Sequence, residues 1–380
     1  MSGPLNGYTF IELAGIGPGP FCGMMLADMG ATVIRVDRPG GNPMAEMGHS
    51  VLSRNRRHLA VDMKHPDGVA TILRLCKTAD GLFEGFRPGV TERLGVGPEA
   101  CMAANPKLVY GRMTGWGQDG PLAHAAGHDM NYIALSGALH AMGRAGEKPA
   151  IPLNLVGDFG GGGMMLAFGM VCAVLEAQRS GKGQVVDSAM TEGSAALMAM
   201  FYGMKNQGLY NGQRGTNLLD GGAPFYDVYE TADGEYVSIG SIEPQFYALL
   251  CQHAELPMED FGKQMDSRLW PEMKEKLATI IKQKTRDQWC DIMEGTDVCF
   301  APVLSLDEAP NHAHNVARDA FIKVDGEVQP APTPRFSRTP SAAPSGKTSS
   351  GAHSVAVLHA SGFDETEIEA LRHAGVIKQD

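Results

Sequence analysis

Two glycine-containing segments of this 380-residue chain each carry a side chain that can transfer a proton. One reads Gly127-His128-Asp129-Met130-Asn131-Tyr132, and the other reads Asn154-Leu155-Val156-Gly157-Asp158-Phe159. An imidazole and a carboxylate are the two groups needed to take a proton from one face of a carbon atom and return a proton to the other face. The pair His128 and Asp158 therefore indicates proton-transfer chemistry.

Both candidates also have a structural interpretation. A single histidine in a turn is usually structural, and Asp158 can serve as a plain N-cap of the helix that follows. The run Gly160 to Gly163 favours a functional role, because four glycines are costly in a helix and are better explained by the close approach of a ligand. Beside His128, Asp129 and Met130 begin an apolar helical stretch whose first N–H groups can stabilise negative charge on an oxygen.

The first half of the chain alternates between strands and helices. Apolar runs predict strands at 8–13, 31–36, 81–84, 108–113 and 184–189, and helical spacing predicts helices at 20–29, 67–78 and 160–178. This alternation is typical of a parallel sheet covered by helices. We therefore predict a large, open, Rossmann-like α/β domain over residues 1–190.

After a linker over residues 191–224, the pattern changes to that of a smaller α+β domain at 225–310. Residues 225–230 and 235–240 flank the turn Ala232-Asp233-Gly234 and predict an antiparallel hairpin, and helical segments follow to about residue 294. Residues 311–380 are predicted to form a return linker and a terminal helix at 364–374, which joins the large domain.

Composition restricts the class of ligand. The chain has 32 basic and 43 acidic residues and a net charge of −11, which argues against a nucleic-acid partner. An anionic ligand must therefore meet a local basic patch. The first quarter of the chain supplies one, and several of its members follow predicted strand ends, where open α/β sheets bind ligands: Arg38, Arg54, Arg56, Arg57, Lys64, Arg87 and Arg93.

Cysteine use and hydropathy predict a soluble cytoplasmic protein. The seven cysteines form no CxxC pair and are scattered, which is typical of free thiols in a reducing compartment. The N-terminus lacks the basic and apolar regions of a signal peptide, and the C-terminus lacks a peroxisomal ending. The most apolar stretch, Met164 to Leu175, is too short to span a bilayer, so we expect no membrane insertion.

The cluster Gly15-Ile16-Gly17 follows the first predicted strand and invites comparison with dinucleotide-binding sites. Asp37 lies about where a ribose-binding acid is expected in such a site. The third glycine of that pattern is replaced by Pro20, which fits a helix start but not the close contact that the pattern needs. An ordinary strand-to-helix turn is the favoured interpretation.

Several motifs along nearly the whole chain are shared with one known family. They are Ile11-Glu12-Leu13-Ala14-Gly15-Ile16-Gly17-Pro18-Gly19-Pro20, Val36-Asp37-Arg38-Pro39, Arg54-Asn55-Arg56-Arg57, Gly85-Phe86-Arg87-Pro88-Gly89, Met113-Thr114-Gly115-Trp116-Gly117-Gln118, Gly127-His128-Asp129, Gly183-Gln184-Val185-Val186-Asp187, Gly221-Gly222-Ala223-Pro224-Phe225-Tyr226 and Glu243-Pro244-Gln245-Phe246-Tyr247. With these motifs the chain resembles the α-methylacyl-CoA racemases, the epimerase branch of the family III CoA-transferases.

The resemblance implies racemisation or epimerisation of 2-methylacyl-CoA thioesters at C2, from (2R) to (2S) and back, by 1,1-proton transfer through an enolate. His128 and Asp158 are then the two catalytic residues, and Glu243 hydrogen-bonds His128 and fixes its tautomer, from the same or the partner subunit. No metal or organic cofactor is implied, because coenzyme A is part of the substrate. The resemblance also implies the family III fold and an interlocked homodimer, with the active site where one subunit's large domain meets the other's small domain.

The resemblance further assigns residues that bind the substrate. The nucleotide end of coenzyme A is held by Arg38, Val61, Asp62, Met63, Lys64, Gly85, Phe86, Arg87 and Arg93. Around the thioester lie Gly127, Asp129, Met130, Asn131, Tyr132 and Asn154. Asp129 is expected to contribute its backbone N–H rather than its carboxylate, and the roles of Arg54, Arg56 and Arg57 are left open. The chain has 22 methionines, and among those near the motifs we expect mostly core residues, with some lining a permissive surface for the acyl chain: Met130, Met142, Met164, Met165, Met190, Met198, Met200 and Met204.

Two other functions remain to be distinguished from racemisation. The same fold supports CoA transfer between carboxylic acids, in which Asp158 attacks the thioester and forms an acyl anhydride. Transferases of this family typically have Gly-Tyr-Asp where this chain has Gly127-His128-Asp129, and a tyrosine does not readily serve as the second base near neutral pH. A non-catalytic acyl-CoA binding module is the third interpretation, and it needs neither His128 nor Asp158.

Overall fold

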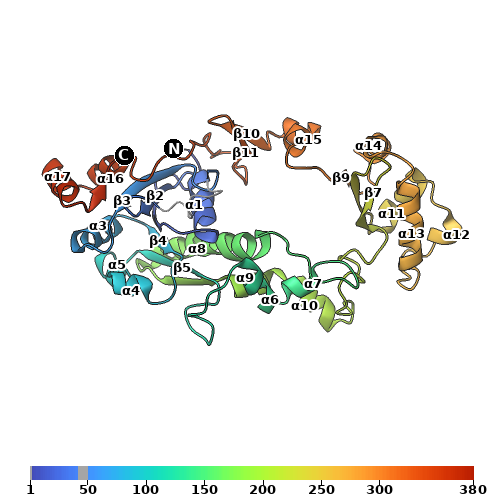
Figure 1. The fold of residues 1–380 in the computed structure, drawn as a ribbon, viewed down its shortest axis with the longest axis horizontal. Helices are drawn as coiled ribbons and strands as arrows, with labels where there is room; N and C mark the ends of the chain where they lie inside the picture. The colour runs from blue at the N-terminus through green and yellow to red at the C-terminus, as the bar shows by residue number, and fades with distance from the viewer. Residues whose placement is uncertain (1, 42–49) are drawn as a thin grey trace. The chain divides into compact units, whose positions relative to one another are not determined.

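The computed structural model describes residues 2–41 and 50–380, which form two compact units (Figure 1). The first unit comprises the chain up to Ser136, Leu153–Leu197 and Phe321–Asp380, and the second comprises Gly137–Pro152 and Met198–Ala320. Residues 137–152 thus belong to the second unit, whereas the first predicted domain runs unbroken to residue 190.

A seven-stranded sheet forms the centre of the described part of the first unit. Its strands are β1 (Thr9–Leu13), β2 (Thr32–Asp37), β3 (Arg56–Val61), β4 (Gly81–Glu84), β5 (Val109–Thr114), β6 (Val185–Ala189) and β12 (Ile377–Lys378). They lie in the order β12-β3-β2-β1-β4-β5-β6, with β1 to β6 parallel and β12 antiparallel to β3. The predicted α/β fold with a large parallel sheet is confirmed. Because the strand order reverses between β1 and β4, a ligand crevice is expected beyond the carboxyl ends of these two strands.

Helices cover both faces of this sheet. Four of them, α3 (Pro66–Cys76), α5 (Pro98–Ala104), α16 (Ser354–Ala360) and α17 (Glu365–His373), contribute to the core on one face, and α1 (Pro18–Asp28) and α8 (Met165–Ser180) contribute to the core on the other. Side chains alternate between the faces along each strand, so Ile11 and Leu82 join the first core while Phe10 and Phe83 join the second.

The helix that carries Asp158 starts earlier than predicted. A π-helix, η1 (Leu155–Met164), runs directly into α8, so the four glycines lie inside the helix and not at its start. A Cβ atom at Gly161 would lie 2.6 Å from the backbone nitrogen of Ser194, and one at Gly163 would lie 2.6 Å from the carbonyl oxygen of Pro18. The glycines therefore let α9 (Met190–Leu197) and α1 pack closely against η1. Our expectation that the glycine run marks the approach of a ligand was wrong.

The same helix also corrects the expectation from hydropathy. It runs without a break from Leu155 to Ser180, which is 26 residues with a mean hydropathy of 1.5 in its most apolar window. By length and composition this helix could cross a membrane, unlike the shorter stretch at 164–175. In that window 44% of the helix is buried inside the protein, and α8 packs on β5 and β6, so the helix fits a role in the core of the first unit.

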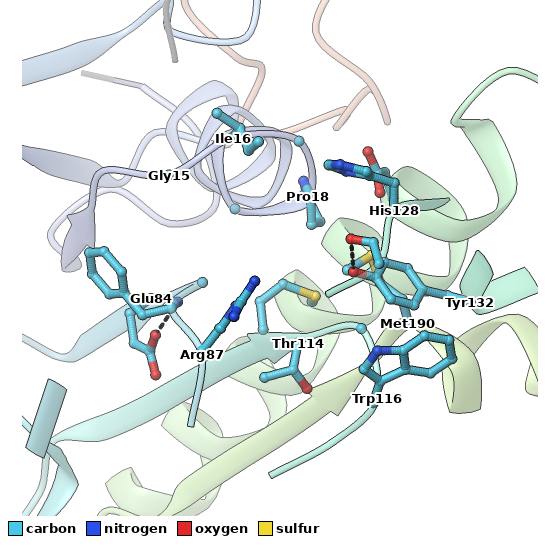
Figure 2. A pocket seen from close by; sticks show the side chains of 18 of the residues that line it. Gly15, Ile16, Pro18, Glu84, Arg87, Thr114, Trp116, His128, Tyr132 and Met190 are labelled. Carbon is cyan, nitrogen blue, oxygen red and sulfur yellow. Dashed lines mark hydrogen bonds between the residues drawn. The ribbon is translucent and has the colours of Figure 1, made fainter. Parts of the chain in front are cut away.

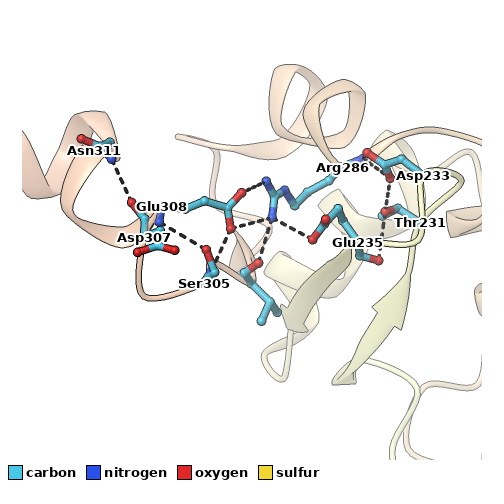
Figure 3. A network of polar contacts seen from close by, with 9 residues as sticks. Thr231, Asp233, Glu235, Arg286, Ser305, Asp307, Glu308 and Asn311 are labelled. Atoms are coloured by element: carbon cyan, nitrogen blue, oxygen red, sulfur yellow. Dashed lines mark hydrogen bonds and ion pairs between the residues drawn. The ribbon is translucent and has the colours of Figure 1, made fainter.

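The second unit contains a three-stranded antiparallel sheet, β7 (Tyr226–Glu230), β8 (Tyr236–Gly240) and β9 (Phe300–Pro302), in that order. The predicted hairpin is therefore confirmed. Helices α11 (Pro244–His253), α12 (Met258–Phe261), α13 (Trp270–Ile281) and α14 (Arg286–Met293) share a core with it, around Phe225 and Trp289. Arg286 contacts both Glu235 and Glu308 (Figure 3). The distance from Arg286 Nη1 to Glu235 Oε2 is 3.2 Å. These contacts fix the segment after β9 to the hairpin.

The remaining elements are short. They are α4 (Val90–Leu94), α6 (Asp129–Leu135), α7 (Ala138–Ala141), α10 (Ala199–Asn206), η2 (Ala309–Asn311), α15 (Ala313–Ala317), β10 (Phe321–Val324) and β11 (Glu327–Pro330). The predicted terminal helix is confirmed as α17, and Asp364 caps it by accepting a hydrogen bond from the N–H of Glu367 at 2.8 Å. Beyond this helix, β12 adds to the edge of the large sheet beside β3.

Candidate active site

A cavity of about 370 Å³ opens at the carboxyl ends of β1, β4 and β5, where the strand order reverses (Figure 2). Its walls come from the turn after β1, the loop after β4 and the end of β5, together with Ala123, residues 125–128 and single side chains from three helices. His128 and Asp158 both line it. The structure therefore brings the two proton-transfer candidates to one pocket, although they lie far apart in the sequence.

His128 lies at the N-terminus of α6 and is exposed toward the pocket. Its backbone N–H donates a hydrogen bond to the side-chain oxygen of Asn131 at 3.0 Å, which fixes the first turn of the helix. The backbone of His128 is extended, so the side chain leaves the helix axis and reaches the cavity (Figure 2). Asn131, predicted as a substrate contact, thus holds the backbone from which the imidazole projects.

Asp158 lies inside η1, one turn from its start, and is half-buried. It is not the N-cap of a helix, so that alternative interpretation was wrong. Burial raises the pKa of the Asp158 carboxyl, and the nearby Asp129 raises it further, while a hydrogen bond from the Asn154 amide at 3.2 Å and the charge of His128 act in the opposite direction. The carboxyl can therefore hold a proton at a higher pH than an ordinary aspartate, which suits a group that must donate one.

Asp129 contacts Asp158 through its carboxylate. The side chain is buried, and its Oδ1 accepts a hydrogen bond from the backbone N–H of Asp158 at 2.6 Å. The other carboxylate oxygen is buried without a hydrogen-bond partner among the described residues. The expectation that Asp129 contributes its backbone N–H to the substrate stays a prediction, and the contact of its carboxylate with Asp158 is an additional finding.

Tyr132 and Trp116 form one wall of the pocket. Their rings meet edge to face with centroids 4.8 Å apart, and the Tyr132 hydroxyl donates a hydrogen bond to the carbonyl of Gly127. A Cβ atom at Gly115 would lie 2.0 Å from the Tyr132 ring, which explains the glycine at that position. Burial and the charge of Asp158 raise the pKa of the Tyr132 hydroxyl, so it remains a neutral hydrogen-bond donor.

The predicted site residues divide into three groups. Those that line the pocket are Gly85, Phe86, Arg87, Gly127, His128, Tyr132 and Asp158. Those that do not line it but contact His128 or Asp158 are Asp129, Asn131 and Asn154. The others lie outside the lining: Arg38 after β2, Val61, Asp62, Met63 and Lys64 at and after the end of β3, Arg93 on α4, and the exposed Met130 on α6.

Several of the outlying residues still lie on the same edge of the sheet as the pocket. Arg38 directly follows β2, and Val61 to Lys64 follow from the end of β3. Because these strands run parallel to β1, their carboxyl ends meet the same edge, and β3 lies only two strands, roughly 10 Å, from β1. A long ligand that enters the pocket can therefore extend along this edge toward Arg38 and Lys64.

Glu243 belongs to the second unit. It is exposed at the N-terminus of α11, and its charge contributes to the raised pKa of the Cys299 thiol after burial, which is the larger cause. The predicted hydrogen bond from Glu243 to His128 stays a prediction.

Two arginines of the basic patch have structural partners. Arg54 is buried and pairs with Asp28 at 2.5 Å, and Arg56 is buried and pairs with Glu12 at 2.9 Å. Asp37 also has structural partners, because it accepts a hydrogen bond from Arg35 at 3.1 Å and contacts the His58 ring nitrogen at 2.7 Å. Since Asp37 is taken, it does not offer a carboxylate to a ribose, which agrees with the interpretation of the first glycine cluster as an ordinary turn.

Some pocket residues were not among the predicted site residues. The turn Ile16-Gly17-Pro18, Thr114, Trp116 and Met190 all line the cavity. The turn follows β1, Thr114 ends β5 and Trp116 follows it, so the rule that ligands bind at the carboxyl ends of parallel strands could have found them. Met190 is the one pocket-lining residue among the eight methionines named above, whereas Met130 and Met200 are exposed.

Comparison with known proteins agrees with this geometry. The sequence profile of CoA-transferase family III matches residues 5–354. The chain is 50% identical over 380 residues to the α-methylacyl-CoA racemase of Mus musculus, covering 99% of this chain and 98% of that protein. It is 46% identical over 379 residues to the α-methylacyl-CoA racemase of Homo sapiens, with the same coverage of 99% and 98%. The crystal structure of a CAIB/BAIF family protein from Brucella suis shares the fold, with a TM-score of 0.81 and 24% identity over 95% of this chain and 100% of that one.

Proposed function

Because the chain belongs to CoA-transferase family III, we propose that it racemises 2-methylacyl-CoA thioesters at C2. Two relatives that are 50% and 46% identical to this chain over nearly its full length are named α-methylacyl-CoA racemase. The observation that carries the proposal is that an imidazole and a carboxyl with a raised pKa line the same pocket from two separate helices.

In the proposed mechanism His128 and Asp158 lie on opposite faces of C2. One of them removes the α-proton, and the other, already protonated, delivers a proton to the opposite face of the resulting enolate, with the roles reversed for the other enantiomer. The raised pKa of Asp158 supports this role, because burial makes its protonated form more accessible than that of an ordinary aspartate. The α-proton of a thioester is a weak acid, and a positioned base contributes only about 10²- to 10⁴-fold.

The enolate oxygen needs hydrogen-bond donors in addition to the two bases. The backbone N–H of Asp129, at the start of α6, is the proposed donor to that oxygen, and removal of one such donor typically costs about 3–4 kcal/mol of transition-state stabilisation. Coenzyme A then runs along the carboxyl edge of the sheet, where Arg87, Lys64 and Arg38 offer cationic groups to its phosphates. We propose no metal or organic cofactor for this reaction.

CoA transfer is the competing function, since it uses the same fold and the same aspartate. Position 128 argues against it, because a histidine is available as the second base and lines the pocket with Asp158. A transferase also needs a free carboxylic acid as acceptor, whereas racemisation needs none.

We further propose that the protein is a cytoplasmic homodimer in which Glu243 of one subunit orients His128 of the other. Free cysteines throughout the described chain support a reducing compartment. Support for self-association comes from Met164, Phe168 and Leu175 on η1 and α8, which are exposed in the single chain at 41%, 68% and 56%. These side chains recur at helical spacing, and such an apolar stripe is typical of a helix face that a partner covers.

The test is to incubate one enantiomer of a 2-methylacyl-CoA with the protein in heavy water, with and without a free carboxylic acid. We expect loss of optical purity and uptake of deuterium at C2 in both reactions. A new CoA ester that forms only with the acid, with retained configuration and no deuterium at C2, would make the protein a transferase. An unchanged thioester after long incubation would reduce it to a binding module.

A further inference from the structure

We propose that Glu84 is a positioning residue whose ionised carboxylate holds the loop Gly85–Gly89 in the shape that receives the substrate, so that substrate binding is linked to the loss of a proton from Glu84. This inference rests on the proposed function only in that the ligand is an acyl-CoA. It concerns binding and not the proton transfer at C2.

The carboxylate of Glu84 fixes the start of the loop. Glu84 ends β4 and is 1% exposed, and its Oε2 accepts a hydrogen bond from the backbone N–H of Phe86 at 2.6 Å (Figure 2). Its Oε1 accepts a second hydrogen bond from Nε of Arg112 on β5 at 3.2 Å. One carboxylate therefore ties the first turn of the loop to the neighbouring strand.

The end of the loop is held through the same arginine. Arg112 donates to the two carboxylate oxygens of Glu92 at 2.8 and 3.3 Å, and Glu92 lies on α4, which begins directly after Gly89. The side-chain hydrogen bonds from Glu84 to Arg112 and from Arg112 to Glu92 thus connect the two ends of the loop. Bidentate arginine contacts of this kind fix orientation as well as distance.

The loop held in this way is part of the pocket. Glu84, Gly85, Phe86, Arg87 and Pro88 all line the cavity, and Figure 2 shows the Arg87 guanidinium directed into it. The Arg87 charge also reaches the far wall, since it lowers the pKa of Tyr132 against the larger effect of burial. A shift of the loop therefore moves the cation that the substrate meets.

Glu84 is placed to change its charge near neutral pH. Burial raises its pKa to about 7, with Glu92 adding to the effect and with Phe86 and Arg112 opposing it. The titratable and charged groups that face it are Arg112 and Tyr110 on β5 and Glu92 on α4. Glu12 on the adjacent β1 lies on the other face of the sheet, on the side of Phe10, and pairs with Arg56.

Protonation weakens the hold on the loop. A neutral carboxyl loses the ion pair with Arg112 and the charge that strengthens the hydrogen bond from Phe86. The bound substrate needs the loop in place, so it favours the ionised form and releases the proton.

The test is calorimetric titration with a non-reactive S-alkyl coenzyme A thioether between pH 6 and pH 8.5. We expect the Kd of the wild-type protein to fall about tenfold as the pH rises, since one pKa unit corresponds to a factor of ten in affinity. We also expect the protein to release a proton when the thioether binds. Titrations in two buffers of different ionisation enthalpy measure this release. In Glu84→Gln both effects disappear.

Glu92→Gln provides an independent variant that leaves Glu84 in place. Its side chain is 45% exposed, so the fold should tolerate the change. Removal of the Glu92 charge lowers the pKa of Glu84, so the midpoint of the pH dependence should move to lower pH. The matched control is Glu369→Gln, which removes an exposed partner of Arg372 on α17 and should leave the pH dependence unchanged.

The outcomes separate this inference from the proposed function. An unchanged pH dependence in Glu84→Gln, tighter binding at low pH, or an unmoved midpoint in Glu92→Gln would each overturn the role of Glu84. If the thioether binds to none of the proteins, the proposed function fails instead. Circular dichroism checks the fold of Glu84→Gln, and if that variant does not fold, Glu92→Gln alone decides.

Discussion

The carboxylate of Asp129 lies directly behind Asp158 and accepts a hydrogen bond from its backbone N–H at 2.6 Å. The contact requires a glycine between them, because a Cβ atom at Gly157 would lie 2.4 Å from the same carboxylate oxygen. A buried carboxylate with one unpartnered oxygen is unfavourable unless it has a role. Its evident effect is to raise the pKa of Asp158, in addition to burial.

Asp129→Asn should therefore shift the pH dependence of racemisation. The amide oxygen can still accept the hydrogen bond from Asp158, but the negative charge that raises the Asp158 pKa is gone. The Asp158 pKa then falls. The part of the pH–rate profile that depends on protonated Asp158 should therefore move to lower pH. Initial rates in the two directions between pH 5 and pH 9 measure this shift. If the profile keeps its wild-type position and only the maximal rate falls, Asp129 acts through the backbone alone.

His128→Ala should lower racemisation by about 10²- to 10⁴-fold, because a positioned base contributes that much. Binding of a non-reactive coenzyme A thioether should change little, since the loop after β4 is untouched. His124→Ala is the matched control, because His124 is an exposed histidine of the same loop that does not line the pocket. Nearly full activity after His128→Ala would remove His128 from the mechanism.

Gly17→Ala should impair catalysis through Asp158. Gly17 has a φ of +66°, which an L-residue adopts at a cost of roughly 1–2 kcal/mol, and its added Cβ would lie 2.8 Å from Oδ2 of Asp158. We expect kcat to fall about 10- to 100-fold as the carboxyl is displaced, in line with the sensitivity of catalysis to positioning. Gly19→Ala, two residues on in the same pocket wall, meets nothing within 4 Å and should retain wild-type kcat. Equal activity of the two variants would contradict a role for the turn in placing Asp158.

The large sheet could be predicted from the sequence because strand and helix patterns alternate over most of the first unit. Its crossover order could not, since apolar runs do not specify their neighbours in the sheet. The start of η1 was missed although Asn154 at its N-cap position is a residue type that favours helix starts, and the glycine run was misread because the closeness of α1 and α9 is a tertiary feature. Likewise, nothing in the spacing of Asp129 and Asp158 indicates that the carboxylate of one accepts a hydrogen bond from the backbone of the other.

Glu84→Gln should stabilise the folded protein at alkaline pH relative to acid pH. Burial raises the pKa of Glu84 from 4.5 to about 7. The protonated form of Glu84 therefore contributes to the free energy of unfolding of the wild-type protein in full below pH 4.5, and this contribution is lost as the pH rises to about 7. The glutamine does not titrate, so the free energy of unfolding of the variant relative to wild type should rise by up to roughly 3 kcal/mol over that interval. Urea unfolding at pH 5 and pH 8 measures the difference. A difference independent of pH would contradict the raised pKa.

Phe168→Glu tests the proposed homodimer. Phe168 is 68% exposed between Met164 and Leu175 on one face of the helix η1–α8, so a buried charge at that position should weaken a partner contact that covers this face. We expect sedimentation equilibrium to show a dimer for the wild-type protein and at least a tenfold higher dissociation constant for the variant. Leu306→Glu is the control, because Leu306 is 94% exposed in the second unit and lies outside this apolar stripe. A wild-type protein that stays monomeric at micromolar concentration would overturn the dimer, and with it the proposal that Glu243 reaches His128 from a partner subunit.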